Sequence, residues 1–172
     1  MKSILIIDDE KQICESVKMI LDYEDYHSEY STDVEEGLEK LKYNYFDALL
    51  LDIQMPGMTG FEVLKWMEEQ DIKIPVIVIS AHSTLENAVK ATKLGAFDFL
   101  EKPIDRDKLL ISIRNAVGHS KLKKENETLK ENLGIEQEII GESKKIRQII
   151  ETVDRIAQTD ARVLITGENG TG

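Results

Sequence analysis

Cysteine, proline and long apolar runs are scarce in this chain of 172 residues, which has one cysteine and three prolines. The single thiol, Cys14, excludes an internal disulfide and fits a reducing compartment. No apolar run approaches the ~18 residues of a membrane-spanning helix, and the short run at residues 4–7 is followed at once by three acids, which excludes a signal peptide. We therefore expect a cytoplasmic protein with no membrane partner.

Basic residues are also too few to balance the acids. The chain has 22 Lys and Arg against 33 Asp and Glu, a formal charge of -11. Residues 1–118 carry 23 acids and 13 bases (net -10), and residues 119–172 carry 10 and 9 (net -1). A chain this acidic is repelled by a phosphate backbone, so nucleic acid is a poor ligand for this part of the protein.

The first part of the chain alternates between strand and helix patterns. Nearly continuous apolar runs, typical of parallel strands buried on both faces, lie at residues 4–7, 48–51, 76–79 and 97–100, with a weaker one at 29–31. Helices are predicted between them, because 59–62 and 83–86 match capping boxes and Asp33 and Asp105 are candidate caps. This alternation predicts an α/β fold with a doubly wound, five-stranded parallel sheet.

Three carboxylates follow two of the predicted strands. Asp8 and Asp9 come directly after the first strand, and Asp52 comes after the third. If the strand order is 2-1-3-4-5, these strand ends are neighbours and the three acids converge at the edge where open parallel sheets bind ligands. Clustered carboxylates repel one another unless a cation compensates, and hard oxygen ligands suit Mg²⁺.

Other groups at the same edge complete a phosphoryl-acceptor site. Lys102 precedes Pro103 after the fifth strand, and a cis bond there could aim its ammonium at the acids. Ser80 ends the fourth strand, and a tight glycine-containing loop follows Asp52. An aspartate surrounded by a metal ion, an ammonium and a hydroxyl can accept a phosphoryl group, since these groups offset the charge on the transferring phosphorus.

The segments IIDDE, LLLDIQMPGMTG, VIVISA and FLEKP resemble, in order and spacing, the receiver domain of bacterial two-component response regulators. The resemblance covers residues 2–118 and implies the flavodoxin-like strand order 2-1-3-4-5. It implies that Asp52 is the phosphoacceptor for a sensor histidine kinase. It further implies that Asp9, Asp52 and the backbone carbonyl of Gln54 bind Mg²⁺, with Asp8 acting largely through water.

The same resemblance also implies which residues change conformation on phosphorylation and which control the lifetime of the phosphoryl group. Lys102 and Ser80 would contact the phosphoryl oxygens, and Phe99 matches the switch aromatic of the fifth strand. Ser80 and Phe99 would then repack one face of the domain and change dimerisation. Gln54 and His82 would line the path of hydrolytic water and tune the lifetime of the phosphoryl group.

Residues 119–137 read as a helical linker. Leu122, Asn126, Leu129 and Leu133 occupy alternating d and a positions of a short coiled coil, and an Asn at an a position favours a parallel dimer. A solvated helix without a partner is the alternative reading. Beyond it, Ser143 could cap an amphipathic helix, and a strand-like run follows at 163–165.

The last six residues, GENGTG, match the first part of the phosphate-binding loop G-x-x-x-x-G-K-[ST]. IIGES and VLITGENGTG resemble the start of the AAA+ ATPase domain of sigma-54-dependent activators of the NtrC family, over residues 138–172. ATP would then be bound by the full-length parent, with Gly167, Gly170, Thr171 and Gly172 forming an incomplete loop here. We expect no ATPase activity from this chain, and expect sigma-54 RNA polymerase and DNA to be partners only of regions outside it.

Two other functions remain open at this stage. An aspartyl-nucleophile phosphatase would use a similar site, but it needs a general acid two residues after the nucleophile, where this chain has Gln54. A receiver that has lost phosphorylation could act only as an interaction module, although the intact Asp8, Ser80 and Lys102 argue against it.

Overall fold

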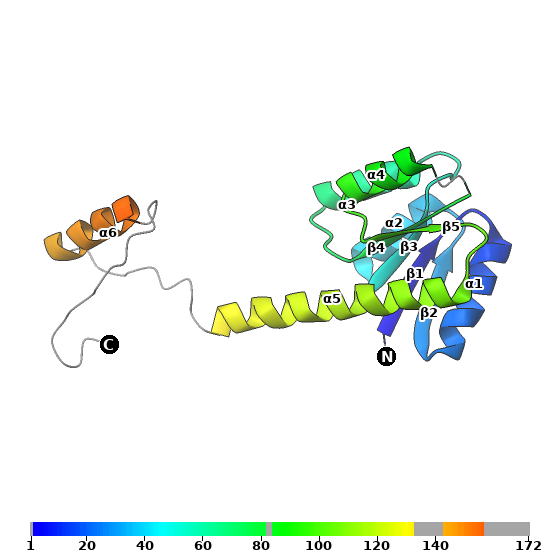
Figure 1. The fold of residues 1–172 in the computed structure, drawn as a ribbon, viewed down its shortest axis with the longest axis horizontal. Helices are drawn as coiled ribbons and strands as arrows, with labels where there is room; N and C mark the ends of the chain where they lie inside the picture. Colours follow the sequence, from blue (N-terminus) through cyan, green and yellow to red (C-terminus); the bar gives the residue numbers. More distant parts are fainter. Residues whose placement is uncertain (1, 82–83, 133–142, 157–172) are drawn as a thin grey trace. The chain divides into compact units, whose positions relative to one another are not determined.

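The structure is a computed structural model that describes residues 2–81, 84–132 and 143–156. Strands and helices alternate from the first described residue (Figure 1). In chain order they are β1 Lys2–Ile7, α1 Lys11–Tyr23, β2 Tyr26–Ser31, α2 Val34–Tyr43, β3 Ala48–Asp52, α3 Gly60–Glu69, β4 Val76–Ser80, α4 Leu85–Lys93, β5 Asp98–Glu101, α5 Arg106–Asn132 and α6 Lys144–Ile156.

The sheet has the predicted topology. Its five strands are all parallel, in the order β2-β1-β3-β4-β5. Ile7 pairs with Ser31 on one side and Leu51 on the other, and Ser80 pairs with Glu101. The carboxyl ends of β1 and β3 are therefore neighbours, and the prediction of a doubly wound α/β fold is confirmed.

Two apolar layers enclose the sheet, because alternate residues of each strand point to opposite faces. Helices α1 and α5 cover one face, and α2, α3 and α4 cover the other (Figure 1). Among the buried residues of the first layer are Ile4, Ile6, Cys14, Val17, Leu21, Leu109 and Ile113. Among those of the second are Leu5, Ile7, Leu49, Leu51, Phe61, Val63, Leu64 and Met67.

The edge strand β2 is held by lysines from both layers. The carbonyl of Ser31 accepts a hydrogen bond from the backbone N–H of Asp8, which follows β1. Because backbone groups alternate in direction along a strand, the carbonyls of Ser28 and Tyr30 point away from β1. Lys18 of α1 donates to the Ser28 carbonyl at 2.6 Å, and Lys40 of α2 donates to the Tyr30 carbonyl at 3.0 Å. The carbonyls of Ser28 and Tyr30 therefore each have a charged partner from the same chain.

Most helix starts follow the predicted caps. Thr59 and Glu62 form the complete capping box at the start of α3, and Asp33 caps α2. The box predicted at residues 83–86 is wrong by one position, since α4 begins after Thr84, whose hydroxyl accepts from the backbone N–H of Asn87. Two adjacent hydroxyl residues compete for this cap, and sequence alone does not decide between them.

Two strand boundaries also differ from the prediction. β2 runs over Tyr26–Ser31, longer than the run at 29–31, because pairing with β1 rather than apolar content makes it a strand. β5 covers Asp98–Glu101, one residue later than predicted.

By its internal contacts the chain divides into two compact units, Met1–Asn126 and Glu127–Gly172. α5 is helical through Asn132, into the predicted linker. α6 starts where Ser143 was expected to cap a helix, with the Ser143 hydroxyl accepting from the Ile146 N–H at 3.3 Å. The strand predicted at 163–165 and the glycine-rich residues at 167–172 lie outside the described residues. No helix within the described ranges is both long and apolar enough to cross a bilayer.

Candidate functional site

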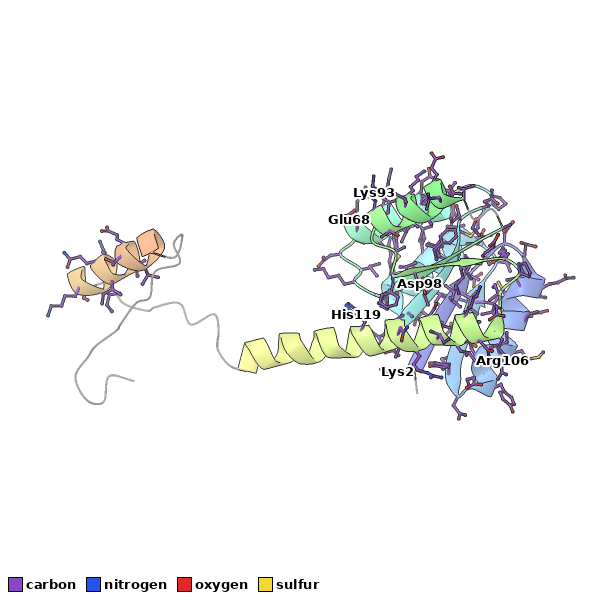
Figure 2. The ribbon with its side chains drawn as sticks, viewed as in Figure 1. Lys2, Glu68, Lys93, Asp98, Arg106 and His119 are labelled. Atoms are coloured by element: carbon purple, nitrogen blue, oxygen red, sulfur yellow. The ribbon has the colours of Figure 1, made fainter. Side chains whose placement is uncertain are left out.

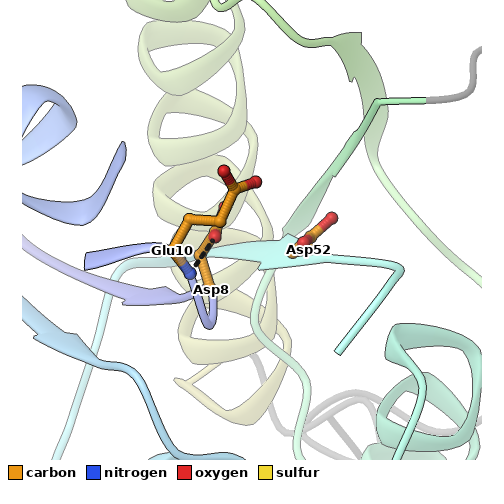
Figure 3. A group of neighbouring side chains, drawn as sticks. All are labelled: Asp8, Glu10 and Asp52. Carbon is orange, nitrogen blue, oxygen red and sulfur yellow. Dashed lines mark hydrogen bonds between the residues drawn. The ribbon is translucent and has the colours of Figure 1, made fainter. Parts of the chain in front are cut away.

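Two buried carboxylates lie side by side at the carboxyl edge of the sheet. Asp8 follows β1 and is fully buried, and Asp52 is the last residue of β3 and is 2% exposed (Figure 3). They meet because β1 and β3 pair directly, with Ile7 opposite Leu51. The structure thus brings these two predicted site residues together.

Lys102 supplies the positive charge of the site. It follows β5, its peptide bond to Pro103 is cis as predicted, and its side chain is 8% exposed. Its Nζ lies 2.9 Å from Asp8 Oδ2, 2.9 Å from Glu10 Oε1 and 3.0 Å from Asp52 Oδ2. One ammonium therefore faces three carboxylates, which leaves an excess of two negative charges when all are ionised.

Burial and charge shift the pKa values in this cluster. Removal from water raises the pKa of Asp8, although the ammonium of Lys102 and the backbone N–H of Glu10 work against that rise. Burial alone would lower the pKa of Lys102, but its close contacts with the carboxylates of Asp8, Glu10 and Asp52 outweigh burial and raise it. Lys102 is therefore a fixed cation across the physiological range.

Two carboxylate oxygens in the site are not satisfied by hydrogen bonds. Asp52 Oδ1 is buried and has no hydrogen-bond partner among the described residues. Asp8 Oδ2 pairs with the Lys102 ammonium by charge at 2.9 Å, but it too receives no hydrogen bond of normal angular geometry within that part of the chain. Buried oxygens left in this state favour a cation or a reacting group beside them.

Glu10 joins the cluster, and the sequence analysis did not single it out. Carboxylate oxygens of Asp8, Glu10 and Asp52 lie within 4.8 Å of one another (Figure 3). The backbone N–H of Glu10 donates to Asp8 Oδ1 at 2.9 Å, and the Glu10 carboxylate accepts from Lys102 Nζ at 2.9 Å. The signal was present in the sequence, because Glu10 is the third consecutive acid after β1.

Asp9, predicted as a metal ligand, has an exposed side chain and is not a member of this group of three. Its role and that of the Gln54 carbonyl stay predictions. The donor set as a whole fits Mg²⁺, since it offers hard carboxylate oxygens, an excess of negative charge and a buried Asp52 oxygen without a hydrogen bond.

The loop after Asp52 needs a glycine where it closes on the strand. A Cβ on Gly60 would lie 2.2 Å from the backbone oxygen of Asp52, and the Gly60 N–H donates to the Ile53 carbonyl at 3.0 Å. Only glycine permits this approach without displacing the backbone. The first turn of α3 is thereby held against the backbone of Asp52.

The remaining predicted residues lie at different depths. Ser80 is buried at the end of β4, and its carbonyl accepts from the Lys102 N–H at 2.9 Å. Phe99 is half-buried and packs against the layer formed by α2, α3 and α4. Gln54 is exposed just after β3. His82 and the residues of the predicted phosphate loop, Gly167, Gly170, Thr171 and Gly172, lie outside the described residues.

Comparison with known proteins agrees with this geometry. Residues 4–114 match the response regulator receiver domain, and residues 139–172 match the sigma-54 interaction domain. The transcriptional regulatory protein ZraR of Klebsiella oxytoca is 35% identical over 169 residues, which are 98% of this chain and 38% of ZraR. The chain thus spans less than half of the length of that relative.

Solved structures give the same result. NtrX from Brucella abortus, crystallised with ATP, superposes with a TM-score of 0.75 and 33% identity, over 93% of this chain and 35% of NtrX. The beryllofluoride-activated NtrC4 receiver domain dimer superposes with a TM-score of 0.66 and 36% identity, over 70% of this chain and 99% of that one.

Proposed function

The chain belongs to the response regulator receiver family, and on that premise we propose that Asp52 accepts a phosphoryl group from a phosphohistidine of a sensor kinase. The observation that carries this proposal is the state of the Asp52 carboxylate. It is buried, one oxygen lies 3.0 Å from the Lys102 ammonium, and the other has no hydrogen bond within the described residues. A carboxylate in this state is oriented, and one oxygen is available as a nucleophile.

The transfer is a single displacement at phosphorus. A carboxylate oxygen of Asp52 attacks, a P–O bond forms as the P–N bond breaks, and the histidine nitrogen leaves with the electron pair of that bond and takes up a proton. Lys102 and Ser80 hold the phosphoryl oxygens. Asp9, Asp52 and the Gln54 carbonyl, with Asp8 acting through water, would hold Mg²⁺, which would offset negative charge on the transferring group.

The signal then passes from Ser80 to Phe99. Ser80 ends β4 and moves toward the new oxygens, and Phe99, half-buried on the neighbouring strand β5, turns inward. Moving a two-state protein from mostly off to mostly on takes about 5 kcal/mol of differential binding. Charge-assisted hydrogen bonds contribute about 1.5–3 kcal/mol each, so Lys102 and Ser80 together are of the right size. Gln54 and His82 tune the rate at which water removes the phosphoryl group.

Phosphorylation of the receiver is proposed to control the assembly of a larger regulator. The receiver and the linker at 119–137 form a homodimer whose state depends on phosphorylation, a proposal supported by the NtrC4 receiver dimer. ATP hydrolysis and contacts with sigma-54 RNA polymerase and DNA belong to regions outside these 172 residues, a proposal supported by the match at 139–172. We place this activity in the cytoplasm.

The test is phosphorylation by a small donor. With acetyl phosphate and Mg²⁺, intact-mass spectra should show one added phosphoryl group on the parent and none on Asp52→Asn. Asp71→Asn is the matched control, since Asp71 is an exposed aspartate in a loop with φ 55°, a conformation that asparagine accepts. A well-folded parent that stays unmodified would contradict the proposal.

Two further measurements complete the test. Light scattering with and without beryllofluoride and Mg²⁺ should report a change in molar mass if phosphorylation controls dimerisation. Turnover of a chromogenic phosphate ester would instead favour the phosphatase alternative, which Gln54 disfavours because it cannot act as a general acid.

A further inference from the structure

Three carboxylates surround the Lys102 ammonium in the unphosphorylated site. Nζ donates hydrogen bonds to Glu10 Oε1 at 2.9 Å and to Asp52 Oδ2 at 3.0 Å, and it pairs by charge with Asp8 Oδ2 at 2.9 Å. An ammonium group has three N–H donors, and two of them are used by these hydrogen bonds. A phosphoryl oxygen that takes the place of the Glu10 carboxylate needs that carboxylate to leave.

The three partners differ in their ability to leave. Asp8 and Asp52 have side chains that are 0% and 3% exposed, and each directly ends or follows a central strand. The Glu10 side chain is 59% exposed, sits at the N-cap of α1 and makes no capping hydrogen bond there. Glu10 can turn into water without breaking any other side-chain contact that the structure shows for it.

Resting on the proposed function of Asp52, we propose that Glu10 is a gate on the phosphoryl-acceptor site. Its carboxylate accepts one of the two hydrogen bonds that Lys102 donates to carboxylates in the unphosphorylated protein, in place of a phosphoryl oxygen. Phosphoryl transfer requires this carboxylate to move into solvent. The gate therefore slows phosphorylation by small anionic donors, which cannot displace Glu10 through contacts of their own elsewhere on the protein.

Glu10 has a second, opposite effect. Its carboxylate lies within 4.8 Å of those of Asp8 and Asp52, so its charge adds to the field that attracts a divalent cation. Removing that charge weakens Mg²⁺ binding while it frees Lys102. A residue that only supported the fold would not change these two properties in opposite directions.

Three variants separate the gate from a general effect of charge. Glu10→Gln removes the charge at almost constant shape. Glu10→Asp keeps the charge but withdraws the carboxylate by one carbon–carbon bond, about 1.5 Å, which takes it out of reach of Lys102. Glu15→Gln is the matched control, because Glu15 lies on the same helix, is 55% exposed and pairs only loosely with Lys11 at 3.7 Å.

The first measurement is the rate of phosphorylation by acetyl phosphate at saturating Mg²⁺ and fixed ionic strength, followed by intact mass. Glu10→Gln and Glu10→Asp should both be about two- to fivefold faster than the parent, the factor that corresponds to an exposed ion pair. Glu15→Gln should match the parent. The second measurement is the Mg²⁺ dissociation constant without donor, taken from the dependence of Tm on Mg²⁺. Glu10→Gln should bind Mg²⁺ about two- to fivefold more weakly, and Glu10→Asp about as tightly as the parent.

Each other result overturns the gate. Slower phosphorylation of both Glu10 variants would make Glu10 a helper of transfer. Faster transfer by Glu10→Gln with parental rates for Glu10→Asp would show an effect of charge alone, and rates equal to the parent in both variants would show no gate. A folded parent that takes up no phosphoryl group would instead refute the proposed function itself, and the gate would fall with it.

Discussion

Helices α3 and α4 cover the same face of the sheet. Each is capped by a threonine that directly precedes it, and the threonine hydroxyl accepts from the backbone N–H three residues later. In α3, five of ten residues are buried, whereas in α4 only Ala91 is buried among nine. Leu85 and Val89 of α4 are 83% and 44% exposed. Capping therefore decides where a helix begins, while burial decides how firmly it is held.

This difference matters for the site because both helices follow strands that end there. α3 begins at Gly60, which lies close to the backbone of Asp52, so the start of this helix is held in place beside the site. α4 follows Ser80, and with one buried residue it can shift at small cost in apolar contact. The less buried helix, α4, thus follows the strand that ends at Ser80, whose hydroxyl is proposed to contact the phosphoryl group.

The largest expected difference between the helices is in core truncation. Met67→Ala in α3 removes a side chain that is 3% exposed and should lower the free energy of unfolding by about 2–5 kcal/mol. Leu85→Ala in α4 removes an exposed side chain and should change it by less than about 0.5 kcal/mol. Urea denaturation measures both, and similar losses in the two variants would contradict the comparison.

The caps should differ less. Thr59→Ala removes the hydroxyl that accepts from the Glu62 N–H and donates to the Glu62 carboxylate, and should cost about 1 kcal/mol in free energy of unfolding. Thr84→Ala should cost less, since α4 contributes little burial to the folded state. Hydrogen exchange should show faster exchange confined to α4 in Thr84→Ala. Exchange that spreads to α3 would show that the two helices unfold together.

A cation–π contact is the next weaker link between the two helices. Lys90 Nζ of α4 lies 4.1 Å from the ring centroid of Phe61 in α3. Lys90→Gln should lower the free energy of unfolding by about 0.5–1 kcal/mol. Lys93→Gln on the same helix, at a position labelled in Figure 2, is the control and should leave it nearly unchanged. Equal effects of the two substitutions would show that the contact with Phe61 does not contribute to the free energy of unfolding.

The smallest expected difference is in the pH dependence of the caps. The Thr59 hydroxyl, and after it the Thr59 backbone N–H, hold the pKa of Glu62 below its ordinary value of 4.5. A carboxyl whose pKa is lowered by folding stabilises the folded state above its unfolded pKa, and this is lost as the pH falls through the folded pKa. The stability difference between parent and Thr59→Ala should therefore shrink on acidification from about pH 7 to about pH 3.5. The difference for Thr84→Ala should stay constant, because Asn87 stands where α3 has Glu62. Parallel behaviour of the two pairs in urea titrations would contradict this.

Much of the fold was predictable because its strands are apolar and its helices carry local start signals. The four strong apolar runs correspond to strands at the predicted places, with boundaries that differ by at most two residues. β2 was underestimated because Ser28 is buried there through polar contacts, with its hydroxyl donating to Asp22 at 2.6 Å. A polar residue that is buried by a partner from another element carries no periodic signal in the sequence.

The site was predictable to the same extent. Asp8 and Asp52 could be placed together because parallel strands end at one edge, and Lys102 because it follows the last of them. Glu10 was missed because its place in the site depends on the contact of its side chain with Lys102, which follows a strand distant in the sequence. The roles of Asp9, Ser80 and Phe99 could be predicted only from the family resemblance.

The lysines on the outer edge of β2 bear on how this molecule behaves at high concentration. A bare strand edge is a template on which a strand of another molecule can add, and sheet-to-sheet growth of this kind leads to aggregates. Lys18 and Lys40 already occupy the outward carbonyls of Ser28 and Tyr30, and they place two charges where an incoming strand would need to donate. These two lysines therefore oppose the addition of a further strand at this edge of the sheet.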